Sequence, residues 1–234
     1  MEVRDLENFN IILLLKSLGT TDVVELSEAL KQPLENTLEL VKRLIQQEII
    51  SRDEFGHIYY ISKRELSFKV TNETLPALND QIMNFLKVFT PINFPRQKNL
   101  VQNQLDGMII EWGIVKDIME NESEFILIWD PKAPVKDIEI SYNHGEKIIN
   151  IQVKSTKSTK LKIEPKDYDR LYDQYGENGY FALKINDFPT YYVPCKDLKE
   201  QKISDVDENI LLTKLSKHYN TEVFKKGIKH CIIP

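Results

Sequence analysis

The feature that most restricts the fold is the order of predicted helices and strands in the second half of the chain. A long helical run is followed by three strand-like runs with short polar breaks, then by a polar-aromatic helix and two more strands. These runs fall at residues 98–119, 124–130, 137–143, 147–155, 165–179, 180–186 and 190–195. Strands grouped ahead of a crossover helix predict a mixed sheet flanked by helices, which places the chain in the α/β (α+β) class.

Two of these strands carry polar side chains where a strand prefers apolar ones. Asp137 opens the strand at 137–143, and Gln152 and Lys154 lie two residues apart in the most apolar strand nearby. Alternate side chains of a strand share a face, so Gln152 and Lys154 project together while Val153 projects to the core. An antiparallel pairing through the turn at 143–146 brings the start of the first strand beside the end of the second. We therefore expect Asp137, Gln152 and Lys154 to converge.

An acid, an amide oxygen and an ammonium that converge indicate a metal-assisted site. Burying such groups singly costs several kcal/mol in order of magnitude, so they are expected to serve one another or a metal. Carboxylate, amide and backbone oxygens suit Mg²⁺, which keeps several waters, and a neighbouring lysine can orient a water and stabilise a phosphate. Mn²⁺ is the expected substitute.

The stretch Asp137-Ile138-Glu139-Ile140, a turn and Ile151-Gln152-Val153-Lys154-Ser155 resembles the PD-(D/E)XK nuclease superfamily, of restriction-endonuclease-like and Holliday-junction-resolvase-like fold. Glu111, four residues after Gly107, resembles the GxxxE glutamate of many members. The resemblance implies that Asp137 binds the metal, that Gln152 replaces the usual second acid and that Val153 lends its carbonyl. It implies that Lys154 serves the attacking water and that Glu111 supports the metal.

Gln152 departs from the Glu or Asp of most members, although the QxK form resembles Mrr-like restriction enzymes. Each residue also fits a plainer interpretation. Asp137 fits a strand start, Lys154 an edge-strand charge that discourages aggregation, and Glu111 an ordinary surface carboxylate. Asp130 is a rival metal ligand in a context typical of a strand-ending turn.

The first 66 residues have the order of a winged helix-turn-helix, which they resemble. Three helices are predicted at 6–18, 23–30 and 34–47, followed by a hairpin around 53–56. The second helix is expected to turn Val24, Leu26, Ala29 and Leu30 inward. Arg43, Arg52, Lys63 and Arg64 suit phosphate contacts, whereas Glu35 and Glu39 make the third helix acidic at its start. The segment thus fits either DNA or a protein partner.

Composition and charge limit the classes of protein to which the chain can belong. The chain is 41% apolar and 29% charged, and its net charge of −5 argues against a general polyanion binder. No apolar run is long enough for a membrane span and no signal peptide is predicted. No glycine-rich loop suggests a nucleotide cofactor. Cys195 and Cys231 show no zinc-type spacing, so a cytoplasmic location is the default.

The sequence therefore predicts a winged helix at 1–66, a helical, proline-containing linker at 67–97 and a nuclease-like domain at 98–234. Basic residues after the candidate strand and on the next helix suit a DNA backbone: Lys157, Lys160, Lys162, Lys166 and Arg170. The predicted function is a metal-dependent DNA endonuclease, and cutting both strands favours a homodimer. The alternatives are a catalytically inactive nuclease-like DNA-binding or regulatory protein, and a winged-helix regulator with an unrelated sensor domain.

Overall fold

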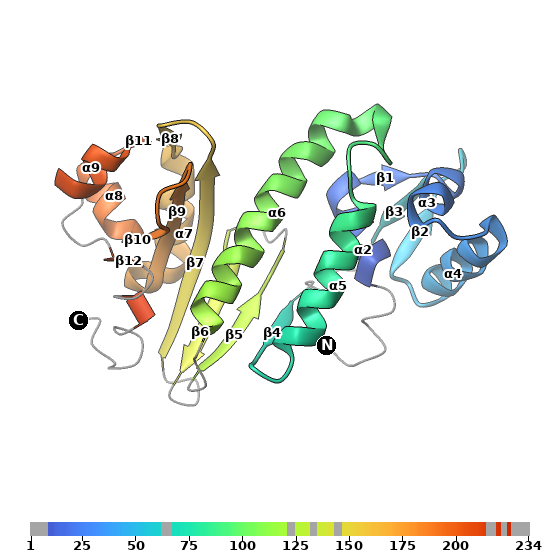
Figure 1. Ribbon diagram of the computed structural model, residues 1–234, viewed down its shortest axis with the longest axis horizontal. Helices are drawn as coiled ribbons and strands as arrows, with labels where there is room; N and C mark the ends of the chain where they lie inside the picture. Colours follow the sequence, from blue (N-terminus) through green and yellow to red (C-terminus); the bar gives the residue numbers. More distant parts are fainter. Residues whose placement is uncertain are drawn as a thin grey trace. The chain divides into compact units, whose positions relative to one another are not determined.

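The computed structural model describes the chain in seven ranges and divides it into two compact units (Figure 1). The described residues are 9–61, 67–120, 125–131, 135–142, 147–213, 219–220 and 224–225. The first unit comprises Met1–Glu65 and Pro76–Met108, and the second comprises Leu66–Leu75 and Ile109–Pro234. In these ranges no helix combines the length and the apolar character needed to cross a membrane.

The described part of the first unit, from residue 9 on, begins with three helices and a small antiparallel sheet of order β1-β3-β2. The elements are α2 (Phe9–Leu18), β1 (Thr20–Thr21), α3 (Val23–Leu30), α4 (Leu34–Gln46), β2 (Ile50–Arg52) and β3 (Ile58–Tyr60). Asp22 caps α3 because its side chain accepts the backbone N–H of Glu25 at 2.8 Å. Helix α3 has the predicted bounds, but the predicted inner face was wrong at Val24, which is 55% exposed, because the helix buries the adjacent Val23 instead.

Residues 67–97, predicted as a linker, hold regular elements that belong to different units. Strand β4 (Phe68–Val70) pairs with the main sheet of the second unit, and its two apolar residues are almost fully buried. Helix α5 (Leu75–Val88) and the 3₁₀ turn η1 (Pro95–Gln97) follow. Phe85, Phe89 and Phe94 form a row of aromatic contacts in the first unit, with ring centroids 5.1 and 6.1 Å apart.

The second unit is built on a seven-stranded mixed sheet of order β12-β10-β9-β7-β6-β5-β4. Its strands include β5 (Phe125–Trp129), β6 (Ile138–Tyr142), β7 (Lys147–Thr156), β9 (Gly179–Ile185), β10 (Tyr191–Pro194) and β12 (Tyr219–Asn220). Its helices are the second half of α6 (Lys98–Met119), then α7 (Pro165–Tyr175), α8 (Cys195–Gln201) and α9 (Glu208–Thr213). Among the described strands, only β7 and β9 pair in parallel, across the helical crossover α7. A short ladder joins β8 (Leu161–Lys162) to β11 (Asp205–Val206).

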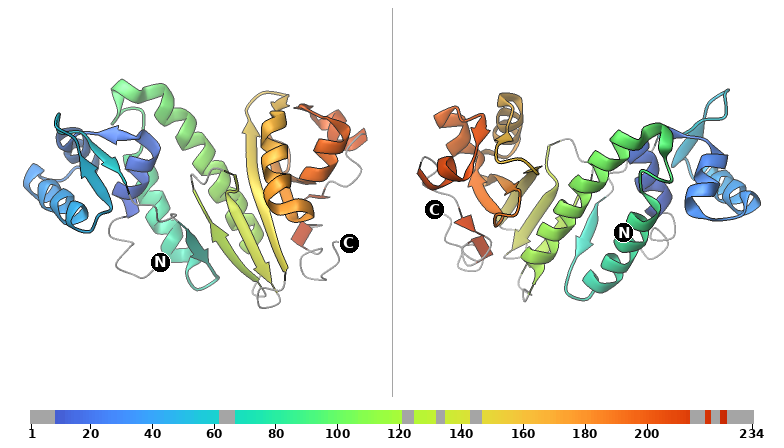
Figure 2. Two further views of the ribbon diagram at one scale, coloured as in Figure 1. Left: turned by 180° about the vertical axis from the view of Figure 1, so that it is seen from behind. Right: turned by 45° about the horizontal axis from the view of Figure 1, so that its top comes forward.

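The strand register assigns side chains to the two faces of this sheet. One face carries the registered row Trp129, Ile138, Ile151 and Tyr180, and Trp112 of α6 packs against Trp129 with ring centroids 5.3 Å apart. The other face carries the registered pairs Gln152 with Phe181 and Lys154 with Leu183. Opposite views show α6 and α7 on different faces (Figures 1 and 2). Gln152 and Lys154 therefore point to the α7 face.

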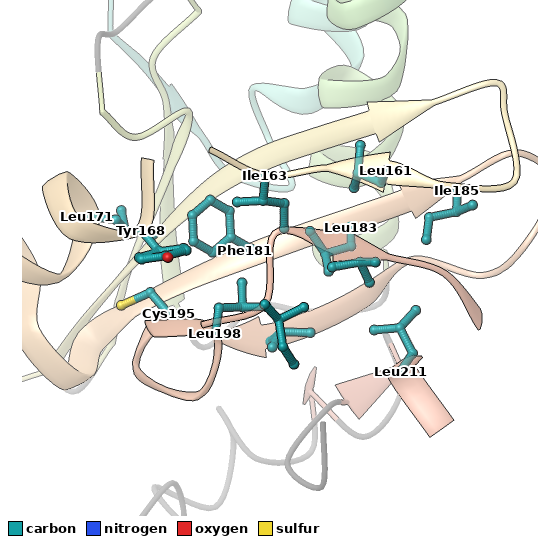
Figure 3. Close-up of a cluster of buried hydrophobic side chains, with 13 residues drawn as sticks. Leu161, Ile163, Tyr168, Leu171, Phe181, Leu183, Ile185, Cys195, Leu198 and Leu211 are labelled. Atoms are coloured by element: carbon teal, nitrogen blue, oxygen red, sulfur yellow. The ribbon is translucent and has the colours of Figure 1, made fainter. Parts of the chain in front are cut away.

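An apolar core fixes α7 and α8 against that face (Figure 3). Tyr168 and Leu171 of α7 are buried against residues of β9, including Phe181. Burial raises the pKa of the Cys195 thiol to about 12, which keeps it a neutral core residue. Cys231 lies outside the described residues. The packed helix provides a rigid support for polar groups at the end of the sheet.

Candidate active site

Hydrogen bonds tie Asp137 to the strands around it. Its backbone N–H donates to the carbonyl of Ile151 at 2.8 Å, and its own carbonyl accepts the N–H of Asp130 at 2.7 Å. Its carboxylate oxygen Oδ2 accepts the N–H of Val153 at 2.7 Å. A side-chain oxygen thus takes a bond that a strand carbonyl would normally make. Asp137 lies beside the backbone between Gln152 and Lys154.

Gln152, the residue before Val153, presents an amide oxygen on the α7 face of β7. Its Oε1 atom is buried, and no donor in the described part of the chain reaches it. Leaving a buried acceptor without a donor costs about 1–3 kcal/mol, so this oxygen is suited to a donor or a cation. Asn150, two residues earlier on the same face, presents a second buried amide oxygen of the same kind, again as judged within the described ranges.

Lys154 is held by a carboxylate that the sequence interpretation did not include. Its Nζ atom donates to Oδ2 of Asp167 at 2.7 Å, and the two side chains are 26% and 16% exposed. Asp167 lies in the first turn of α7. The only sequence signal for it was an acid near the start of the helix that follows the candidate strand, and spacing alone does not pair that acid with Lys154.

Asp130 belongs to a second charged cluster on the same face. The ammonium of Lys136 binds Glu139 and lies 3.7 Å from Oδ2 of Asp130, and all three side chains are largely buried. Lys136 also lies over the ring of Tyr175 of α7, 5.8 Å from its centroid. Burial by itself lowers the pKa of Lys136, but the hydrogen bond and charge of Glu139, with the charge of Asp130, raise it above the ordinary value. The ammonium of Lys136 is therefore the cation that lies beside Asp130 in the structure.

Glu111 lies at the other face of the sheet. Its Oε2 atom accepts the indole N–H of Trp129 at 3.4 Å. The next residue along β5, Asp130, is the one whose N–H binds the carbonyl of Asp137. Glu111 thus approaches the same end of the strands from the α6 side, whereas Gln152 and Lys154 approach from the α7 side.

The predicted DNA-binding residues are exposed where the structure describes them. Lys157, Lys160, Lys162, Lys166 and Arg170 follow the candidate strand, and Arg43 and Arg52 lie in the first unit. Lys166 forms an exposed ion pair with Glu164, and Arg52 donates to the carbonyl of Gly56 at 3.3 Å. Lys63 and Arg64 lie outside the described residues.

The donor set fits a metal that requires few protein ligands. Among the described residues, no group of three or more His, Cys, Asp or Glu side chains is arranged to hold a metal ion. Asp137 and the buried oxygen of Gln152 supply one carboxylate and one amide oxygen. Mg²⁺ is commonly held by one or two carboxylates and keeps several waters. The residues present are compatible with such an ion and not with a structural zinc site.

The chain was compared with protein families, curated proteins and solved structures. No protein-family model matches the chain, and no curated protein matches it. Among solved structures, the chain is similar to Hjc, a Holliday junction resolvase from Archaeoglobus fulgidus, with 19% sequence identity and a TM-score of 0.40. The similarity covers 52% of this chain and 96% of that one. At that TM-score we draw the function from the site residues alone.

Proposed function

We propose that the chain is a metal-dependent DNA endonuclease that hydrolyses phosphodiester bonds. The observation that carries this proposal is the 2.7 Å hydrogen bond between the carboxylate of Asp137 and the N–H of Val153. It sets an acid beside the two residues, Gln152 and Lys154, that share the adjacent face of β7. An anion, a buried amide oxygen that no donor among the described residues reaches, and a lysine are together suited to phosphoryl chemistry with a cation.

The metal would be held by the carboxylate of Asp137, the amide oxygen of Gln152 and the carbonyl of Val153, with Glu111 in support. When bound, Mg²⁺ or Mn²⁺ supplies Lewis-acid polarisation of a phosphate and of a water. Lys154 has three donors, of which one serves Asp167. The remaining N–H groups can orient the attacking water and stabilise negative charge on the phosphate.

The first unit is proposed as a winged helix that aids recognition of the substrate or of a partner. Three helices followed by a β2–β3 hairpin support this assignment. Arg43 near the end of α4 and Arg52 at the end of β2 are exposed cations suited to phosphates. The exposed Glu35 and Glu39 of α4 favour a protein surface instead, for example a second copy of the chain.

A second candidate is an inactive nuclease-like protein that binds DNA or regulates another factor. Gln152 favours it, because a neutral amide is a weaker metal ligand than a carboxylate. Among the described residues, no group of three or more His, Cys, Asp or Glu side chains is arranged to hold a metal ion, which points the same way.

Cleavage of supercoiled plasmid DNA separates the two candidates. The endonuclease proposal predicts nicked or linear DNA with Mg²⁺ or Mn²⁺ and none with EDTA. DNA binding without cleavage under either metal would reject it in favour of the inactive protein.

A further inference from the structure

The geometry points to Asp167 as a positioning residue that holds Lys154 in its working place. This inference rests on the proposed nuclease function and adds a residue to it. The distance of 2.7 Å between Asp167 Oδ2 and Lys154 Nζ makes a charge-assisted hydrogen bond. The two residues come from different elements, α7 and β7, and meet on the face that also carries Gln152.

The ion pair of Asp167 with Lys154 is less exposed to solvent than the ion pair that Asp169, also on α7, makes with Lys199. Asp167 and Lys154 are 16% and 26% exposed, whereas Asp169 and its partner Lys199 are 48% and 35% exposed, 3.1 Å apart. Exposed pairs contribute little because solvent screens them. A partly desolvated pair is screened less and holds its geometry better.

The support behind Asp167 is rigid. Asp167 follows Pro165 in the first turn of α7, and its N–H donates to the carbonyl of Glu164 at 2.8 Å. The neighbouring Tyr168 and Leu171 are buried in the core that joins α7 to β9. The carboxylate is therefore fixed to the sheet by packing, and it fixes in turn the end of a lysine chain that would otherwise sample many rotamers.

Because Asp167 is negatively charged, its removal should affect the cleavage rate and the affinity for DNA differently. An anion next to Lys154 weakens the attraction of that ammonium for phosphate, so its removal should not reduce affinity for DNA. Its removal should reduce the rate, because a catalytic group displaced by about 1 Å can cost about 100-fold. A loss of turnover with unchanged or tighter DNA binding is the signature of a positioning residue.

The test compares Asp167→Asn, Asp167→Glu and the control Asp169→Asn in the full chain. We measure the rate at saturating plasmid DNA with Mg²⁺, the Kd for the same DNA in EDTA, and the melting temperature. We expect Asp167→Asn to lower the rate by about 10- to 100-fold, with Kd within threefold of wild type or tighter. Asp167→Glu should recover part of the rate, and Asp169→Asn should match wild type.

The outcomes separate this inference from the function on which it rests. A rate within twofold of wild type for Asp167→Asn, or a loss of DNA affinity parallel to the loss of rate, overturns the role of Asp167 and leaves the nuclease standing. If Asp167→Asn does not fold, the comparison passes to Asp167→Glu, which must lose rate without losing affinity or melting temperature. Absence of cleavage by the wild-type protein overturns the proposed function, and this inference with it.

Discussion

The carboxylate of Asp137 accepts a hydrogen bond from the backbone N–H of Val153 at 2.7 Å. One side chain thereby joins the start of β6 to the segment of β7 between Gln152 and Lys154. The contact has both a structural and a chemical consequence, because the carboxylate whose Oδ2 atom completes the strand pairing also carries the negative charge of the site. Substitutions at this position can separate the two roles.

Asp137→Asn keeps an oxygen that can accept the N–H of Val153 but removes the charge. We expect its free energy of unfolding to stay within about 1.5 kcal/mol of wild type, with loss of metal-dependent cleavage. Asp137→Ala loses the acceptor as well and should be destabilised by about 1–3 kcal/mol. Urea unfolding and plasmid cleavage measure the two effects. Full cleavage by Asp137→Asn would show that the carboxylate is purely structural.

Gln152→Glu adds a carboxylate where the buried amide oxygen now lies. The Mg²⁺ concentration for half-maximal cleavage should fall or stay level, since a charged oxygen is a stronger ligand for a hard cation. The metal dependence of the cleavage rate measures this, with circular dichroism to confirm folding. A folded Gln152→Glu protein that fails to cut DNA whichever metal is supplied would show that the amide has another task, such as a hydrogen bond to the substrate.

Gly179 and Gly113 offer a matched pair of glycine-to-alanine substitutions in the second unit. A methyl group on Gly179 would lie 2.9 Å from Sγ of Cys195 and 3.1 Å from Cγ of Leu171, so Gly179→Ala should cost about 1–3 kcal/mol. Apart from its chain neighbours and the backbone of its own helix turn, no described atom lies within 4 Å of a methyl group on Gly113, inside α6, where alanine should gain up to about 1 kcal/mol. Thermal unfolding should shift in opposite directions, and equal shifts would contradict the packing of α7 and α8 on β9.

Arg43→Ala and Arg52→Ala test whether the first unit contacts DNA. If each arginine neutralises one phosphate, each variant should lower the slope of log affinity against log salt by about one unit. Lys87→Ala in α5 is the control, since this lysine is already hydrogen-bonded to Asn84 at 3.3 Å. Titrations at several salt concentrations give the slopes. Unchanged slopes for both arginine variants would assign the first unit to a protein partner.

The periodic apolar runs made much of the second unit predictable. The helix expected at 98–119 is α6 with the same bounds, and the strand runs correspond to β5, β6 and β7 within two residues. The fold class, a mixed sheet flanked by helices, is confirmed. Such runs are predictable because a long apolar stripe or a strict alternation admits few alternatives.

Contacts between distant segments were not predictable in the same way. Nothing within Phe68–Val70 indicates that this short strand pairs with β5, because its partner lies more than fifty residues away. The ion pair of Asp167 with Lys154 likewise depends on how far α7 is rotated on the sheet. The sequence pattern also does not distinguish two adjacent residues of the same kind. In α3 either Val23 or Val24 could take the one buried position, and the structure buries Val23.

The most direct test of the proposed site is the effect of Lys154→Ala on two quantities, the rate of plasmid cleavage with Mg²⁺ and the Kd for the same DNA. If Lys154 serves the attacking water, cleavage should disappear while Kd stays within a few-fold, since one ammonium contributes little to the total phosphate affinity. A parallel loss of binding and cleavage would make Lys154 a phosphate anchor, and undiminished cleavage would place the active site elsewhere.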